Sequence, residues 1–179
     1  MKKVKLPEGI SKFAKSNSGF MYLDGFEWTL DNEEDFNAWF GTEEGDHNSY
    51  LFCFAQDGAG GMFCFWRETP GNDFSNTHVI YLSSEGEVGY ISKNFIQFLE
   101  LLATGYILFS LVCYGDAYRF DQDVDDEEKK ESNEEHNSLL KKIKSVFNAE
   151  PLRSVDDFLS KRKENNHLVE AWIESRKSK

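Results

Sequence analysis

Apolar positions recur in short blocks along the first two thirds of the chain, and each block predicts one element. Leu6, Ile10 and Phe13 follow helical spacing after Pro7, a residue that is favourable in the first turn of a helix. Gly19 then supplies the usual C-terminal stop. We therefore expect a short helix near the N-terminus.

The next block combines two β-prone runs with a helix signal. Residues 20–30 flank Asp24-Gly25, a dipeptide typical of tight hairpin turns. Asp31 and Glu34 have the spacing of a capping box, so a short helix should begin here and end at Gly41. The aromatic residues on one face of this helix would be Phe36, Trp39 and Phe40.

Four further apolar runs predict strands joined in two hairpins. Residues 50–55 and 62–66 are continuously apolar, which suits central strands buried on both faces, and the Gly-rich stretch 56–61 supplies their turn. Residues 78–82 and 87–91 flank four turn residues and form the second pair. The predicted core residues are Phe52, Phe54, Phe63, Phe65, Val79, Tyr81, Phe95, Phe98, Leu99 and Leu102.

Helices are expected again after the hairpins. Ser92 is placed to cap a helix whose apolar residues recur at i, i+3, i+4 and i+7. Segment 106–113 is apolar, but its pattern does not decide between helix and strand. Residues 139–147 and 154–176 have amphipathic helical spacing. This order predicts an α+β fold, with a mixed or mainly antiparallel sheet of hairpins flanked by helices and a C-terminal helical extension.

Charge divides the chain into three segments. Residues 1–120 hold 8 basic and 17 acidic residues, residues 121–135 hold 2 and 9, and residues 136–179 hold 10 and 6. The middle stretch cannot form a core, so we interpret it as a solvated linker or an exposed helix start. The predicted organisation is an α+β domain over 1–120, an acidic linker over 121–138 and a helical tail over 139–179.

Composition narrows the functional classes. The 179 residues carry a net charge of −12, and no apolar run reaches the roughly 18 residues of a membrane span. Nucleic-acid phosphates would repel such an acidic chain, which leaves a protein with a basic surface as the expected partner. The N-terminus lacks the apolar stretch of a signal peptide, and three widely spaced cysteines suit a reducing compartment. We expect a cytoplasmic protein that binds neither nucleic acid nor membrane.

The chain lacks the residue spacings that are typical of phosphate-binding loops, metal sites and catalytic nucleophiles. Gly58–Gly61 precedes a strand and has no Lys where a phosphate-binding loop needs one, so a flexible hairpin loop is the simpler interpretation. No metal-binding spacing links the cysteines and histidines of this region, which are Cys53, Cys64, His47 and His78. No nucleophile motif is present. We expect no catalytic residue, no metal and no cofactor.

One segment is unusual in its charge. From Ser16 to Asp46 the chain has nine carboxylates and no Lys or Arg. Ordinary surfaces mix both signs, whereas a patch of one sign speeds encounter with an oppositely charged partner. The alternative is a solvated face with its tryptophans in the core. The candidate partner-binding residues are Asp24, Glu27, Trp28, Asp31, Glu33, Glu34, Asp35, Trp39, Glu43, Glu44 and Asp46.

Several packing and turn patterns occur in a familiar order. They are Leu6-Pro7 with Phe13, Asn17 and Gly19, then Asp57-Gly58 with Gly61, then Val79–Leu82 with Glu85-Gly86, and the helix Phe95–Leu102. Over residues 5–104 this order resembles the SUKH superfamily, named for cell-wall-assembly regulators of yeast and their bacterial relatives. The chain differs in Ser18, where members have Gly, and in its acidic linker and helical tail.

The resemblance implies a non-enzymatic α+β domain. Many bacterial members look like immunity proteins that bind and neutralise toxins, often nucleases. The leading hypothesis is a cytoplasmic immunity protein, a monomer or weak dimer, whose segment 24–46 makes much of the contact with a basic toxin. The alternatives are a regulatory scaffold that holds partners through the charged tail, and an enzyme that uses an unrecognised Cys or carboxylate.

Overall fold

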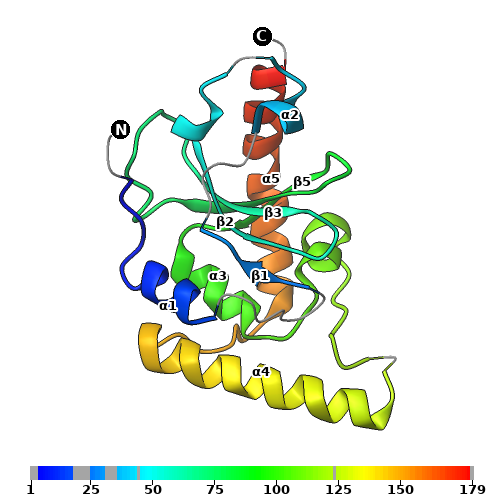
Figure 1. Cartoon of the computed structure of the whole chain (residues 1–179). Helices are drawn as coiled ribbons and strands as arrows, with labels where there is room; N and C mark the ends of the chain where they lie inside the picture. The colour runs from blue at the N-terminus through cyan, green and yellow to red at the C-terminus, as the bar shows by residue number, and fades with distance from the viewer. Residues whose placement is uncertain (1–3, 18–24, 31–35, 44, 123, 178–179) are drawn as a thin grey trace.

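Five strands lie side by side in chain order, and every neighbouring pair is antiparallel. The strands are β1 (Glu27–Trp28), β2 (Leu51–Gln56), β3 (Met62–Trp66), β4 (His78–Leu82) and β5 (Val88–Ser92). The structure is a computed structural model that describes residues 4–17, 25–30, 36–43, 45–122 and 124–177 (Figure 1). It confirms the predicted α+β fold, with a sheet that is antiparallel throughout.

Helices cover both faces of this sheet. In β3, Phe63 and Phe65 face the first core, which contains residues of α1 (Ile10–Asn17) and α3 (Phe95–Leu102). Met62, Cys64 and Trp66 point the other way, toward α2 (Phe36–Phe40) and α5 (Val155–Lys177). Successive side chains of a strand point to opposite faces, so burial of both faces explains why the run shows no polar alternation.

The predicted core is confirmed. All ten predicted residues are buried and belong to the first core, between the sheet and α1 and α3. Many of them are aromatic and meet edge to face, as Phe98 meets Phe54 with ring centroids 5.1 Å apart. Such pairs add to the free energy gained by burying their area. The sequence pattern therefore located the centre of the fold correctly.

Both C-terminal helices pack against the body of the protein. Leu139 and Ile143 of α4 (Asp126–Phe147) and Phe158 of α5 are buried in the first core. Val169 and Ile173 of α5 are buried in the second core. Figure 1 shows α4, in yellow, below α1 and α3, and α5, in orange to red, behind the sheet.

The helix α4 begins much earlier than the predicted residue 139. Asp125 caps it: its Oδ1 accepts hydrogen bonds from the backbone N–H groups of Glu127 and Glu128, both at 3.0 Å. Most of the expected acidic linker is thus the exposed start of a helix, the other interpretation open to its sequence. Periodicity missed these turns because they bury no apolar side chain.

The structure also shows which residue caps α3, what segment 106–113 forms and where α2 ends. Asn94, not Ser92, caps α3, since Asn94 Oδ1 accepts from the Gln97 N–H at 3.0 Å while Ser92 ends β5. Segment 106–113, undecided from sequence, leads into the π-helical turn η2 (Ser110–Tyr114). The short helix α2 ends at Gly41, in left-handed conformation with φ 67°, as its sequence predicts.

Two predicted features fall on residues outside the described ones: Asp24 with the β-prone run that precedes it, and the Asp31–Glu34 capping box. A single-turn helix η1 (His47–Ser49) leads into β2. In the described part of the chain, no helix combines the length and apolarity needed to cross a bilayer.

Candidate functional site

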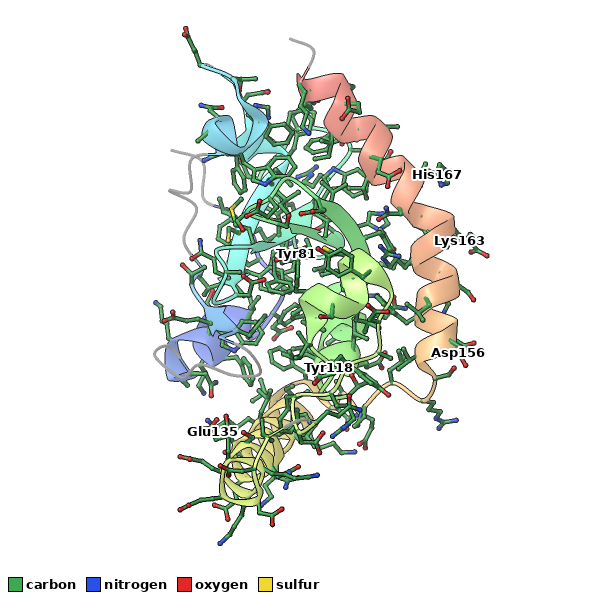
Figure 2. All side chains as sticks on the ribbon, turned by 90° about the vertical axis from the view of Figure 1, so that its right-hand side faces the viewer. Tyr81, Tyr118, Glu135, Asp156, Lys163 and His167 are labelled. Atoms are coloured by element: carbon green, nitrogen blue, oxygen red, sulfur yellow. The ribbon has the colours of Figure 1, made fainter. Side chains whose placement is uncertain are left out.

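Two turns lie side by side at one end of the sheet, the β2–β3 turn and the β4–β5 turn. A Cβ atom on Gly60 of the first would stand 3.9 Å from the Cβ of Ser84 in the second. Glu27 of β1 pairs with Gln56 at the same end. Four carboxylates share this end, which we name the turn end: Glu27, Asp57, Glu85 and Glu87. Figure 2 looks onto it, with Tyr81 near the centre.

Asp57 organises the first turn. Its Oδ1 accepts hydrogen bonds from the backbone N–H groups of Ala59 (3.0 Å) and Gly61 (2.8 Å), and its Oδ2 accepts one from the Tyr81 hydroxyl at 2.5 Å. Residue 61 must be Gly, because a Cβ there would lie 1.9 Å from the Tyr81 hydroxyl oxygen. Burial, reinforced by the Asp57 carboxylate, raises the pKa of Tyr81 far above its usual value, so the phenol remains a donor.

Ser83 organises the second turn in a similar way. Its hydroxyl oxygen accepts hydrogen bonds from the backbone N–H groups of Glu85 (3.2 Å) and Glu87 (2.9 Å), and its hydroxyl donates to the Glu87 carboxylate. This last hydrogen bond lowers the pKa of Glu87, so the carboxylate is ionised at neutral pH. Each turn thus holds one carboxylate by hydrogen bonds, Asp57 in the first and Glu87 in the second.

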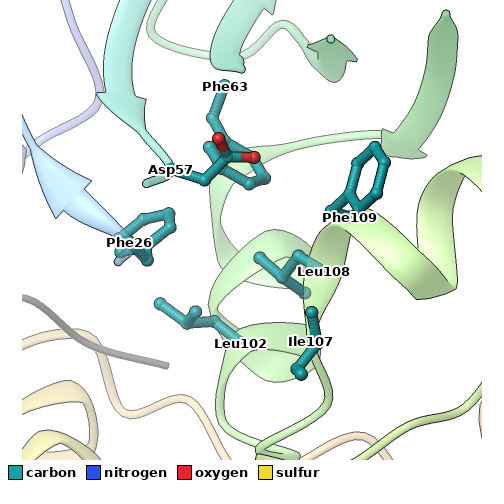
Figure 3. A pocket seen from close by; sticks show the side chains of 7 residues that line it. All are labelled: Phe26, Asp57, Phe63, Leu102, Ile107, Leu108 and Phe109. Atoms are coloured by element: carbon teal, nitrogen blue, oxygen red, sulfur yellow. The ribbon is translucent and has the colours of Figure 1, made fainter. Parts of the chain in front are cut away.

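An apolar cavity lies beside Asp57 (Figure 3). Its other lining residues are Phe26, Phe63, Leu102, Ile107, Leu108 and Phe109. The cavity volume is about 10 Å³, the space of at most one water molecule, so it cannot admit a substrate. Most of the apolar lining residues belong to the first core or pack against it.

The three cysteines, His78 and His136 are buried or half-buried. Burial raises the pKa of the Cys113 thiol to about 11, so it is protonated at neutral pH and a poor nucleophile. Cys53 and Cys64 are register partners on β2 and β3 and are fully buried. Burial lowers the pKa values of His78 and His136, which keeps both rings neutral. Within the described ranges, no three His, Cys, Asp or Glu side chains are grouped to hold a metal ion.

A sequence model of the SMI1/KNR4 family (SUKH-1) matches residues 2–101. The chain belongs to this family. The predicted membership of the SUKH superfamily is therefore confirmed, and the superfamily includes immunity proteins and cell-wall regulators. No curated protein and no solved structure matches the chain.

The family match contains the whole sheet, and its last residue lies within α3. The four carboxylates of the turn end therefore lie within the SMI1/KNR4 region, whereas η2, α4 and α5 follow the matched residues. The family suggests a protein partner.

Among the predicted site residues, the two tryptophans differ in their positions. Trp28 is only 2% exposed and meets the rings of Phe13 and Phe26 edge to face at 5.3 and 5.1 Å. It is a core residue and offers no surface to a partner, as the alternative interpretation of the segment expected. Trp39 is half-buried, and its indole N–H donates to the Ser83 carbonyl at 2.7 Å, next to the turn end.

The described carboxylates of the predicted segment do not form one patch. Glu27 lies at the turn end, whereas Asp46 precedes the opposite end of β2, a strand of six residues that spans roughly 17–20 Å. Glu43 is exposed near Asp46 along the chain. The remaining predicted residues lie outside the described residues: Asp24, Asp31, Glu33, Glu34, Asp35 and Glu44.

The sequence analysis placed Asp57 and Glu85 in predicted turns and Glu87 at the start of a predicted strand, and it assigned none of them to a binding surface. They are separated along the chain, and only the hairpin pairing brings them to one end of the sheet. The signal available in the sequence was the pair of turns itself, because adjacent antiparallel hairpins have their turns on the same side.

Proposed function

We propose that this SMI1/KNR4 family protein is an immunity protein that neutralises a basic, nuclease-type toxin by direct contact through the turn end. The observation that carries the proposal is the pair of neighbouring turns in which hydrogen bonds hold the carboxylates of Asp57 and Glu87 at one end of the sheet. A nuclease needs a basic cleft for its phosphate substrate, and carboxylates held in place complement such a cleft.

Order in the free protein favours tight binding. Asp57 and Ser83 fix the two turns before any partner arrives, so little conformational entropy is lost on association. Tyr114, in η2, adds an aromatic contact surface, since it is 60% exposed and its ring meets Phe109 at 5.3 Å. Aromatic residues are enriched in protein interfaces.

The predicted segment 24–46 remains part of the proposal. Glu27 links it to the turn end, and Trp39 supports the second turn through Ser83. The other described carboxylates, Glu43 and Asp46, form a separate surface that a large toxin would contact at its rim. The proposed location is the cytoplasm, where such a toxin acts, and the proposed state is a monomer or weak dimer.

The test is a protection assay with the toxin gene encoded next to the gene for this chain. Cells that produce the toxin should survive with the wild-type protein and lose protection with the Glu27→Lys/Glu85→Lys variant, whose substitutions are at exposed positions of the turn end. Glu131→Lys/Glu134→Lys on the exposed face of α4 makes the same change of charge elsewhere and should still protect. Circular dichroism and urea unfolding establish that both variants fold.

Absence of protection by the wild-type protein would favour the alternative, a regulatory scaffold similar to the cell-wall regulators. The first turns of α4 carry Glu127, Glu128 and Glu131 on an exposed surface that is suited to a second kind of partner. If the wild-type protein does protect and the folded turn-end variant protects equally well, the turn end is not the binding surface.

A further inference from the structure

The last turn of α5 lies over the segment that contains α2 and η1, and its side chains hold that segment. The Arg176 guanidinium carbon is 3.9 Å from the centroid of the Tyr50 ring, and Nη1 is 3.8 Å from Asp46 Oδ1. Lys177 Nζ is 5.4 Å from the centroid of the Trp39 ring. Cations attract aromatic faces at such distances. We name Arg176, Lys177 and the neighbouring Trp172 the clamp; in Figure 1 the red end of α5 lies beside α2.

A buried histidine lies next to this clamp. His47 is 4% exposed, and its ring is stacked on the Phe40 ring with centroids 4.0 Å apart and an interplanar angle of 4°. Its Nε2 is 3.2 Å from the Thr42 hydroxyl oxygen. Its Nδ1 is buried and has no hydrogen-bond partner among the described residues.

These surroundings favour the neutral form of the His47 ring over the protonated form. In the doubly protonated ring both nitrogens are donors, and Nδ1 would then lack an acceptor among the described residues. Burial and the nearby Arg176 cation both lower the pKa of His47, while Asp46 acts in the opposite direction. Lys177 and Glu174, 3.9 Å apart, are the other charged groups of the α5 end.

We propose that the clamp is closed while His47 is neutral and opens when His47 takes up a proton. A proton on His47 places two cations, His47 and Arg176, in one poorly solvated site. Moving Arg176 away from His47 breaks its contact with the Tyr50 ring and its ion pair with Asp46. Opening would expose the faces of Tyr50 and Trp172, which lie 5.8 Å apart, and free the Asp46 carboxylate. This inference does not depend on the proposed function.

The test is hydrogen exchange of the α5 C-terminal peptide in the full chain, with each variant compared with wild type at the same pH. His47→Gln keeps a neutral polar side chain at this position. His167→Gln is the matched control, because His167 is exposed on the same helix. At pH 7 all three proteins should exchange alike. Below the pH at which the clamp begins to open, the peptide should exchange faster in wild type and His167→Gln than in His47→Gln. The ratio of the exchange rates should grow by about tenfold for each pH unit if opening is linked to the binding of one proton.

Equal exchange of wild type and His47→Gln at every pH would overturn the proposal. A second measurement covers the case in which His47→Gln does not fold. The ring protons of His47, followed by NMR in the full chain, should titrate at higher pH in Arg176→Gln than in wild type, since the like charge is gone. An unchanged titration would equally overturn it, because Arg176 would then not sense the proton.

Discussion

Tyr81 donates its hydroxyl hydrogen to Asp57 Oδ2 over 2.5 Å and thereby ties β4 to the β2–β3 turn. The bond passes over Gly61, whose missing side chain leaves room for the phenol. On the other side of the same turn, a Cβ on Gly25 would stand 2.7 Å from the Gly58 Cα. Close backbone approach at glycines and one hydrogen bond therefore define the shape of the turn end.

Removing this hydroxyl should destabilise the protein. We expect Tyr81→Phe to lower the free energy of unfolding by about 1.5–3 kcal/mol, the usual contribution of a hydrogen bond to a charged group. Urea unfolding measures this loss. Tyr114→Phe is the control, because that ring is 60% exposed and its hydroxyl has little to lose. Equal stability of the two variants would show that the hydrogen bond does not hold the turn.

The second prediction concerns Phe98, which lies in the first core. It is fully buried and its ring centroid lies 5.9 Å from that of Phe63 and 6.1 Å from that of Phe26. Phe98→Ala should cost about 3–5 kcal/mol through lost burial and an unfilled cavity. A melting temperature within a few degrees of wild type would place this helix elsewhere.

The docking of α5 gives a matched pair of substitutions. Ile173 is 2% exposed in the second core, while Leu168 on the same helix is 46% exposed. Ile173→Ala should lower the unfolding free energy by about 2–5 kcal/mol, and Leu168→Ala should change it by less than about 0.5 kcal/mol. Deletion of residues 121–179 should then cause aggregation or loss of the cooperative transition. A soluble, equally stable truncated protein would contradict the packing of both C-terminal helices.

The free energy of unfolding should fall as the pH drops below 7. Burial lowers the pKa values of His78 and His136, so the unfolded chain binds protons below about pH 6.5 that the folded protein does not. Their contribution to stability is complete above that pH and is lost as pH falls below it. The urea midpoint should therefore drop between pH 7 and 5 in wild type and drop less in His78→Gln/His136→Gln. If the urea midpoint of the folded double variant falls with pH as steeply as that of wild type, groups other than His78 and His136 cause the pH dependence.

Charge reversal in the predicted segment tests the expectation made from sequence. We expect Glu33→Lys/Glu34→Lys/Asp35→Lys to slow association with a basic toxin at low salt. The difference should shrink as the Debye length falls from about 30 Å at 0.01 M to about 10 Å at 0.1 M. Circular dichroism must accompany the binding measurement, since each Lys near a helix N-terminus costs roughly 0.3–1 kcal/mol. A folded triple variant with the wild-type association rate would remove this segment from the contact.

Local sequence patterns were sufficient to predict most strands of the sheet. The run 62–66 became β3, and 78–82 became β4, because a strand needs only a few consecutive residues that can be buried. The start of α4 was missed for the opposite reason. Its first turns are stabilised by the Asp125 cap and by acidic residues near the helix N-terminus, neither of which depends on an apolar period.

The sequence by itself determined the strands, the ten core residues, the acidic character of the chain and its resemblance to the SUKH superfamily, because each is a property of neighbouring residues or of composition. Only the tertiary structure decided which charges share a surface. Antiparallel pairing joins Glu27, Asp57 and Glu87 at one end of the sheet and leaves Asp46 at the other. The docking of α5 brings Arg176 to Asp46 from the far end of the chain, and thus supplies the counter-charge that the segment 16–46 lacks. Contacts between residues so distant in sequence depend on how helices and strands pack, which no local pattern encodes.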